Sequence, residues 1–324
     1  MVLFNKNEKG ADELVDVLGL IDKDLTFDKW APIVPLGVRD LRAVIGSETV
    51  DALDKFYKED TGEPDENATE EKKKEAENMR EAVRLAQQAA GMFTWLKVIP
   101  TLEAQHGNAG RGKRLGENER GLTGAQEFKD EDNIRNMAYE AIDALVELMD
   151  AYEFTFWMKS PKKKAIAGLL IKDKETFDEY YTTGSHRLFL ALVPMIREVQ
   201  ESNIIPILTR ARFEQLLQGD ETLSAKLMDA TRRPLALLAV KKAVERLPIE
   251  VLPTGIVQVQ QTATVRDKVK AEKEARAAVA ASLQADAAAM LEKLVDLVAE
   301  LDAEEQPVDY HVTGPTLQTR GITF

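Results

Sequence analysis

The glycine-rich stretch HGNAGRGKRLGENERG, residues 106–121, is the part of the sequence that most resembles a chemical motif. Gly107, Gly112 and Lys113 have the spacing G-x-x-x-x-G-K, in which backbone N–H groups can cradle a nucleotide phosphate. Such a loop also needs a preceding strand, a helix that opens at the lysine, and Ser or Thr after it to hold magnesium. Here the preceding segment is expected to be a helix, and Arg114 follows the lysine. We therefore expect no nucleotide site and no cofactor.

The same loop carries a concentration of positive charge in an acidic protein. Arg111, Lys113 and Arg114 follow one another closely between glycines, with no apolar residue to anchor them. One interpretation is a contact arm that orders against an acidic neighbour or touches passing DNA transiently. The other is a solvated surface loop without a partner. A nucleic-acid or nucleotide-handling enzyme that uses this loop is the alternative from a different functional class.

Histidine and serine offer little for catalysis. His106, His186 and His311 are far apart, and none belongs to an H-x-x-x-H or H-x-E pair that would suggest a metal site. Ser185 and His186 are adjacent, so their side chains should diverge and not act as nucleophile and base. The carboxylates of residues 59–77 are mixed with lysines, as on a solvated helix face. We expect no catalytic and no metal site, and hence no enzyme.

Composition bounds the class of protein. The chain has 324 residues, 44% of them hydrophobic, and a formal net charge of −13. That charge argues against general binding to nucleic acid or anionic membranes, both of which need a basic surface. The absence of cysteine removes disulfides and thiolate zinc sites and fits a reducing cytoplasm. No apolar run reaches the roughly 20 residues of a membrane span, so we expect a soluble protein without membrane contact.

Helical periodicity dominates the elements that would hold any site. Met79 to Leu96 carry apolar residues at i, i+3 and i+4, and Pro100 is expected to end this helix. A second long helix is predicted over residues 131–158, and Trp95, Trp157 and Tyr180-Tyr181 are interpreted as core. Two later prolines should interrupt helices. We predict that Pro194 kinks one helix and that Pro234 splits another or begins its second half.

The C-terminal part combines a long helix with an extended tail. Residues 262–305 are nearly unbroken helix formers of about 60 Å, with a seam that includes Leu283, Ala287 and Leu294. The tail, residues 306–324, is apolar but contains Gly and Pro that oppose a helix. Alternation in VDYHV suits strand addition to a neighbouring subunit, although a frayed terminus is the alternative. The tail residues that we predict to bind a partner are Tyr310, Val312, Leu317, Ile322 and Phe324.

The predicted fold is therefore all-α, an elongated helical bundle with one small β-hairpin and an extended C-terminal tail. Short helices are expected in residues 1–58. Residues 59–261 should form the central bundle, which includes the basic loop at 106–126 and a hairpin at 249–261 around Pro-Thr-Gly. The long helix at 262–305 and the tail at 306–324 complete the chain.

Several of these segments, in this order, resemble a family of uncharacterised, mainly helical proteins from bacteriophage and prophage structural gene clusters. The opening segment is LTFDKWAPIVPLGVRDLRAVIGSETVDAL, and the central loop is AGRGKRLGENERGLTGAQEFK. The later segments are FWMKSPKKKAIAGLLIKDKETFDEYY, GSHRLFLALVPMIREVQESNIIPIL and the hairpin IEVLPTGIVQV. The resemblance covers about residues 20 to 300 and brings no catalytic residue with it.

This resemblance implies a structural protein of a phage or phage-tail-like particle. It implies a head–tail connector, adaptor or neck protein that forms a homo-oligomeric ring between portal and tail. Its partners would be portal, tail or neck proteins, and it would be made in the bacterial host cytoplasm and located in the virion. The alternatives are a tail completion, terminator or cap protein of a contractile particle, or an assembly chaperone outside the virion.

Overall fold

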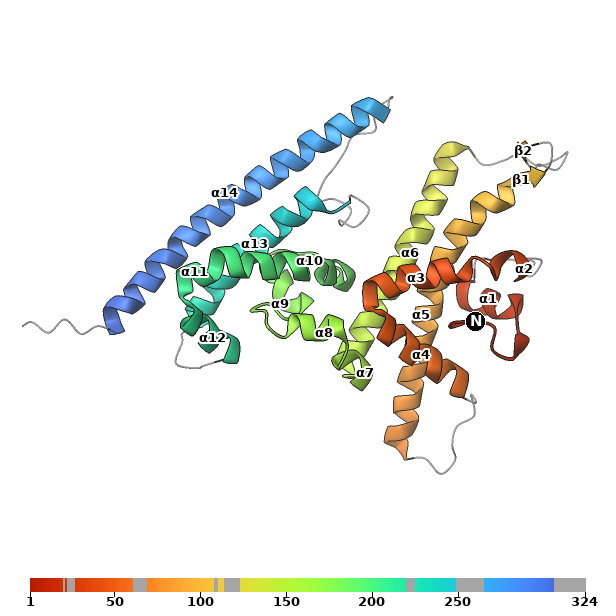
Figure 1. The fold of residues 1–324 in the computed structure, drawn as a ribbon, viewed down its shortest axis with the longest axis horizontal. Helices are drawn as coiled ribbons and strands as arrows, with labels where there is room; N and C mark the ends of the chain where they lie inside the picture. The colour runs from red at the N-terminus through yellow and green to blue at the C-terminus, as the bar shows by residue number, and fades with distance from the viewer. Residues whose placement is uncertain are drawn as a thin grey trace, which may run out of the picture.

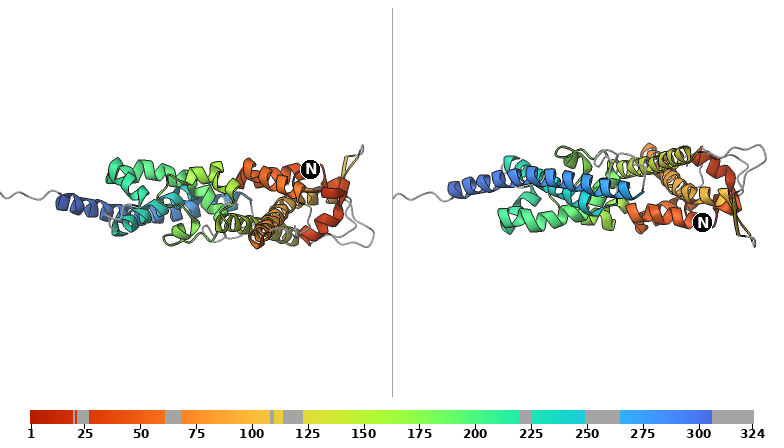
Figure 2. Two further views of the ribbon diagram at one scale, coloured as in Figure 1. Left: turned by 90° about the horizontal axis from the view of Figure 1, so that it is seen from below. Right: turned by 90° about the horizontal axis from the view of Figure 1, so that it is seen from above.

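The structure, a computed structural model, consists almost entirely of helices in an elongated arrangement (Figure 1). It describes residues 1–19, 21, 27–60, 69–107, 110–113, 123–219, 225–248 and 265–305. Two further views show that the molecule is much thinner in the perpendicular direction (Figure 2). The all-α prediction is therefore confirmed for the described residues, apart from two short strands.

The helices fall into two groups along the long axis. The first group surrounds a long pair, and its members are η1 (Lys6–Glu8), α1 (Ala11–Leu18), α2 (Phe27–Trp30), α3 (Val34–Ile45), α4 (Ser47–Glu59), α5 (Glu70–Glu103) and α6 (Gly124–Ala151). The second group ends in another long pair, and its members are α7 (Thr155–Met158), α8 (Pro161–Ile166), α9 (Lys174–Asp178), α10 (His186–Val199), the π-helix η2 (Gln200–Ile204), α11 (Ile205–Leu208), α12 (Arg210–Gln218), α13 (Ala225–Arg246) and α14 (Val265–Glu305). The division into the four segments 1–58, 59–261, 262–305 and 306–324 stays a prediction.

Close approach between helices fixes the first group. α1 to α4 all contact α5, which also packs along α6. A Cβ built on Gly37 of α3 would lie 2.4 Å from the backbone oxygen of Ala90 and 2.1 Å from the hydroxyl of Thr94. Only glycine therefore allows α3 to approach α5 this closely. Trp30 is fully buried beside Trp95, with ring centroids 5.9 Å apart.

Buried polar bonds tie the first residues of the chain to the same helices. The backbone N–H of Leu3 donates to Asp54 Oδ1 at 2.8 Å, and Gln87 Nε2 donates to the carbonyl of Leu3 at 2.7 Å. Tyr57 donates its hydroxyl proton to Glu13, and burial is the main cause that raises the pKa of Tyr57 far above its ordinary value. Because these bonds are directional, they set the position of the segment as well as its burial.

Two predictions about prolines need correction. α5 continues through Pro100 to Glu103, where the helix had been expected to end, and the hydroxyl of Thr101 donates to the carbonyl of Val98 nearby. α13 likewise runs unbroken through the buried Pro234. There, buried residues on both sides of the proline hold the helix, so packing outweighs one lost backbone hydrogen bond. Pro194 lies inside α10, as predicted.

The long helix expected over residues 131–158 is also different. α6 begins earlier, at Gly124, because Thr123 and Gln126 form a capping box in which each side chain bonds the other's backbone. It ends at Ala151, and Glu153 turns the chain with a φ of 48° before α7 begins. The predicted segment is therefore two helices separated by a tight turn.

The β structure lies elsewhere than predicted. The hairpin expected at 249–261 is not confirmed, because those residues lie outside the described ones. Strands β1 (Ala104–Gly107) and β2 (Gly110–Lys113) pair antiparallel instead, within the stretch that had been expected to be a loop. In this pairing Gln105 lies opposite Gly112.

Candidate interaction sites

The residues predicted to bind partners lie at the edges of the described structure. Arg111 and Lys113 belong to β2, where Arg111 pairs with His106 of β1 in the backbone register. Arg114 and the tail residues from Tyr310 to Phe324 lie outside the described residues. The described residues therefore do not test these predicted contacts, and their roles stay predictions.

The backbone around Lys113 differs from that of a phosphate-binding loop. Gly112 and Lys113 are the last two residues of an antiparallel strand, and the residues that follow the lysine lie outside the described ones. The N–H groups that would hold a phosphate in a P-loop come from the first turn of a helix. The G-x-x-x-x-G-K spacing is thus met by a hairpin.

The side chains of Ser185 and His186 make contacts at the start of α10. The hydroxyl of Ser185 caps α10 by accepting from the N–H of Leu188 at 3.1 Å, and it also donates to Asp143 at 3.1 Å. His186 is buried at the start of α10, with Nε2 3.7 Å from a carboxylate oxygen of Glu175. The two side chains contact different carboxylates, Asp143 and Glu175.

The part of the chain that the structure describes holds no group of three or more His, Asp or Glu side chains arranged to bind a metal ion.

None of its helices combines the length and apolar character needed to cross a membrane.

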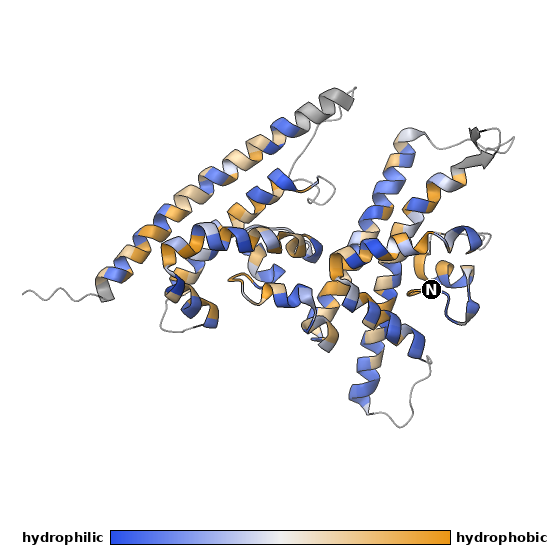
Figure 3. Cartoon of the chain, viewed as in Figure 1, coloured by the Kyte–Doolittle hydropathy of each residue, from blue (hydrophilic) through white to orange (hydrophobic). Residues whose placement is uncertain are grey.

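The predicted seam of the long C-terminal helix is confirmed. α14 packs antiparallel along α13, and Leu283, Ala287 and Leu294 are buried against it. The other faces of α14 are exposed, and Val295, next to the seam, is 49% exposed. Apolar and polar residues accordingly alternate along this helix (Figure 3). Burial is therefore one-sided.

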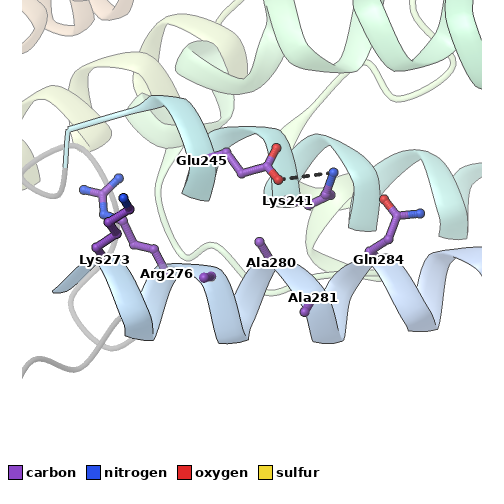
Figure 4. Close-up of a pocket in the computed structure, with 8 residues that line it drawn as sticks. Lys241, Glu245, Lys273, Arg276, Ala280, Ala281 and Gln284 are labelled. Carbon is purple, nitrogen blue, oxygen red and sulfur yellow. Dashed lines mark ion pairs between the residues drawn. The ribbon is translucent and has the colours of Figure 1, made fainter. Parts of the chain in front are cut away.

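The seam opens into a hollow of about 590 Å³ at one end (Figure 4). Ala277, Ala280 and Ala281 of α14 line it, and their short side chains leave the space unfilled. Across the hollow, Lys241 and Glu245 of α13 form an ion pair of 3.2 Å. Arg276 closes the end of α13 by donating to the carbonyls of Val244 and Leu247 at 3.0 and 2.7 Å.

A larger, aromatic groove lies where the turn after α6 meets the first half of α5. Its volume is about 840 Å³, and Phe56, Met79, Tyr152, Phe154 and Phe156 provide its apolar lining. The three aromatic rings of the turn stack one on the next. The ring centroids of Tyr152 and Phe154 are 6.4 Å apart, and those of Phe154 and Phe156 are 5.5 Å apart. We call this surface the aromatic groove.

The tight turn at Glu153 creates the aromatic groove. Its left-handed φ of 48° places Tyr152 and Phe154 on one side of the chain, where a continuing helix would have separated them. Tyr152 is left 46% exposed, and Glu71, Lys72, Lys74 and Glu75 of α5 add charges of both signs at the rim. An apolar base with a charged rim is typical of a protein-binding surface.

Sequence reasoning missed this groove. The signal was present, because YEFTF places an aromatic residue at every second position, which is a spacing unlike that of a helix face. The helix predicted over residues 131–158 included these residues, and their period of two was overlooked. The partner wall on α5 could not have been inferred from the sequence alone, since it depends on the packing of α5 against α6.

The fold and these surfaces define a mainly helical protein with an open aromatic groove and a hollow beside its C-terminal helix. Residues 41–166 and 199–303, well over half of the chain, match DUF6712, a family of unknown function. The chain belongs to this family. No curated protein and no solved structure matches it.

Proposed function

We propose that this protein is a structural subunit of a phage or phage-tail-like particle. In this proposal it is a head–tail connector, adaptor or neck protein that forms a ring between portal and tail and is carried in the virion. The resemblance of its segments to proteins of phage structural gene clusters supports the proposal that it belongs to such a particle. The elongated helical fold supports a role in assembly, and such a role needs no catalytic residue.

The observation that carries the assembly role is the aromatic groove. Tyr152 is 46% exposed above Phe154 and Phe156, and the groove is about 840 Å³ in volume. Exposed aromatic side chains over an apolar base are common in the energetic centres of protein interfaces. A chain that left such a groove open would expose apolar surface to water at a free-energy cost.

The occupant that we propose is the tail, residues 306–324, of a neighbouring copy. That segment offers Tyr310, Val312, Leu317, Ile322 and Phe324 as apolar side chains and only two charged residues, Asp309 and Arg320. It follows α14 directly, and α14 reaches the end of the molecule opposite to the first helices (Figure 1). A tail that leaves one end of a subunit is well placed to bind the next subunit and close a ring.

Truncation and a point substitution test the proposal together. We expect the full chain to form rings, or to bind its portal, in light-scattering and negative-stain measurements. Truncation after Gln306 and Tyr152→Asp should each abolish assembly while leaving the helical content and melting temperature of the monomer almost unchanged. Phe128→Asp is the matched control, because Phe128 is 58% exposed on α6 and does not line the groove.

Four outcomes would contradict the proposal. Normal assembly of the truncated chain would show that the tail is dispensable. Equal loss in the Phe128 control would show that the effect is not specific to the groove. A protein that is absent from purified particles but needed to build them would instead be an assembly chaperone. Location at the tip or end of the tail would favour the cap or terminator alternative.

A further inference from the structure

A short segment at the start of the sequence is held by the first group of helices as a protein holds a bound peptide. Residues 2–6 precede α1 and are bonded to α1, α4 and α5, and the N-terminus lies among these helices in Figure 1. The side chains of Leu3 and Phe4 are buried, whereas the preceding Met1 is 45% exposed. We call residues 2–6 the anchor segment. Its two buried side chains are the apolar contacts that a bound peptide would make.

Two buried side chains hold the backbone of the anchor segment. Asp54 of α4 accepts from the N–H of Leu3 at 2.8 Å, and Gln87 of α5 donates to the carbonyl of the same residue at 2.7 Å. If the segment left, each side chain would lose a hydrogen-bond partner inside the protein, which is costly. Asp54 and Gln87 therefore favour a backbone segment at this place.

The end of the anchor segment is held by α1 and by the C-terminal end of α4. The N–H of Asn5 donates to Glu13 at 2.5 Å, and the N–H of Lys6 donates to the hydroxyl of Tyr57 at 2.7 Å. Lys6 Nζ also donates to the carbonyls of Tyr57 and Asp60. A cation is favoured beside the last carbonyls of a helix. The lysine is thus a third recognised side chain, after the two apolar ones.

Residues 7–10 connect the anchor segment to α1 in a tight turn. Glu8 has a φ of 57°, a left-handed conformation that is unfavourable for an L-residue, and Gly10 has a φ of 56°. The N–H of Gly10 donates to Asn5 Oδ1 at 2.9 Å. Extension of the connection would break this bond but release the strain at Glu8. Short connections under strain favour the exchange of a segment between copies of a protein.

We propose that copies of this chain exchange the anchor segment, so that residues 2–6 of one copy bind between α1, α4 and α5 of another. Each contact of the bound segment is available in either copy, so the two forms differ mainly in the connection and in the entropy of association. An extended connection of residues 7–10 spans roughly 15 Å, so the two binding surfaces must face each other closely. The inference goes beyond the proposed function, because it involves neither the tail nor the aromatic groove.

Binding of a labelled peptide tests how the segment is recognised. The probe is Met-Val-Leu-Phe-Asn-Lys, the sequence of residues 1–6, with both ends blocked. Leu3→Asp in the full chain opposes burial of the chain's own segment, so this variant should bind the probe saturably and at least about tenfold more tightly than the wild type. Adding Gln87→Ala should weaken that binding at least about tenfold. Met1→Asp, at an exposed position, is the matched control and should bind like the wild type.

Energy transfer between two labelled populations of the full chain tests the exchange itself. Because the sequence has no cysteine, Met1→Cys can carry a donor dye in one population, and Glu59→Cys, an exposed residue at the end of α4, an acceptor in the other. Transfer should appear slowly after mixing, because a buried segment must first be released, and should rise with protein concentration. Excess unlabelled peptide should abolish it. Tyr152→Asp in both populations should leave it unchanged, since the aromatic groove takes no part in exchange.

These measurements can fail independently of the proposed function. The proposal is overturned if no transfer appears, if transfer persists in excess peptide, or if a folded Leu3→Asp variant binds no peptide. Loss of transfer in the Tyr152 variant would also overturn it, by showing that the copies meet only through the aromatic groove. If Leu3→Asp does not fold, energy transfer decides the question, because it is measured on chains with an intact anchor segment.

Discussion

The helices around α5 and the α13–α14 pair are held together by different means. In the first region, the backbone of Leu3 is bonded to Asp54 and Gln87, and Gly37 brings α3 against α5 at backbone distance. In the second, small and aliphatic side chains such as Ala287 and Leu294 fill the seam, and directional bonds hold α14 at its ends, as where Arg276 donates to the carbonyl of Leu247. Directional bonds and tight backbone contact specify one arrangement, whereas an aliphatic seam specifies burial.

This difference indicates how the molecule divides its tasks. The first region forms a fixed support for the aromatic groove, whose wall is the first half of α5. The second region exposes most of α14 and leads into the tail. Under the proposed function, the first region would receive a partner and the second region would reach toward it. Each of the following substitutions tests one side of this comparison.

The largest effect is expected in the seam. Leu294→Asp places a carboxylate at a fully buried position and should destabilise the α13–α14 pair by about 3–5 kcal/mol. Hydrogen exchange should become fast in α14 while protection in α3, α5 and α6 stays as in the wild type. Val295→Asp, at the exposed neighbouring position, is the control. Loss of protection across the whole molecule would mean that the two regions unfold as one unit.

Gly37→Ala is expected to destabilise the first region, by less than Leu294→Asp destabilises the α13–α14 pair. The added methyl group meets the backbone oxygen of Ala90 at 2.4 Å, so α3 must move away from α5, at a cost of about 1–3 kcal/mol. Chemical denaturation should give a lower midpoint for the first region. Gly168→Ala is the matched control, because no atom lies within 4 Å of its added Cβ. Equal midpoints for both variants would contradict the close contact.

The turn between the two regions should show an effect of opposite sign. Glu153 adopts a φ of 48°, which costs an L-residue roughly 1–2 kcal/mol. Glu153→Gly removes that strain but adds about 0.5–1 kcal/mol of chain entropy on folding. The net result is expected to be a slightly raised melting temperature by calorimetry, with Glu153→Gln unchanged. A lowered melting temperature in the glycine variant would indicate that the turn is unstrained.

The smallest expected effect is the change of folding stability with pH. Glu198 of α10 accepts bonds from Lys242 and Arg246 of α13, and these cations lower its pKa to about 2. A lowered pKa means that the carboxylate favours the folded state at neutral pH and that this contribution disappears as pH falls from about 4.5 to about 2. Because the pair is exposed, the gain is small.

Melting curves of wild type and Glu198→Gln check this expectation. The wild type should melt slightly higher at neutral pH, and the two curves should converge as the pH falls through about 2, where Glu198 becomes protonated. A difference that persists at low pH would have to arise from packing. A difference that grows at low pH would contradict the direction of the pKa shift.

The sequence predicted the long helices because their apolar residues recur at helical spacing, and it located the seam at Leu283, Ala287 and Leu294 correctly. It failed where tertiary packing or capping decides. Pro234 stays in a helix because its neighbours are buried, and the Thr123–Gln126 capping box was readable but overlooked. The YEFTF alternation indicates the aromatic side of the groove, but its other wall on α5 depends on helix packing that no local pattern shows.

The α13–α14 seam also determines how this part of the molecule would respond to mechanical force. Tension along the axes of an antiparallel helix pair loads all contacts of the seam at once, whereas force on one end separates them in turn. Alanine buries less surface than leucine, so contacts near Ala280, beside the hollow, resist separation less than those near Leu294. A force that peels α14 from its N-terminal end therefore meets less resistance than one that peels it from the end that leads to the tail.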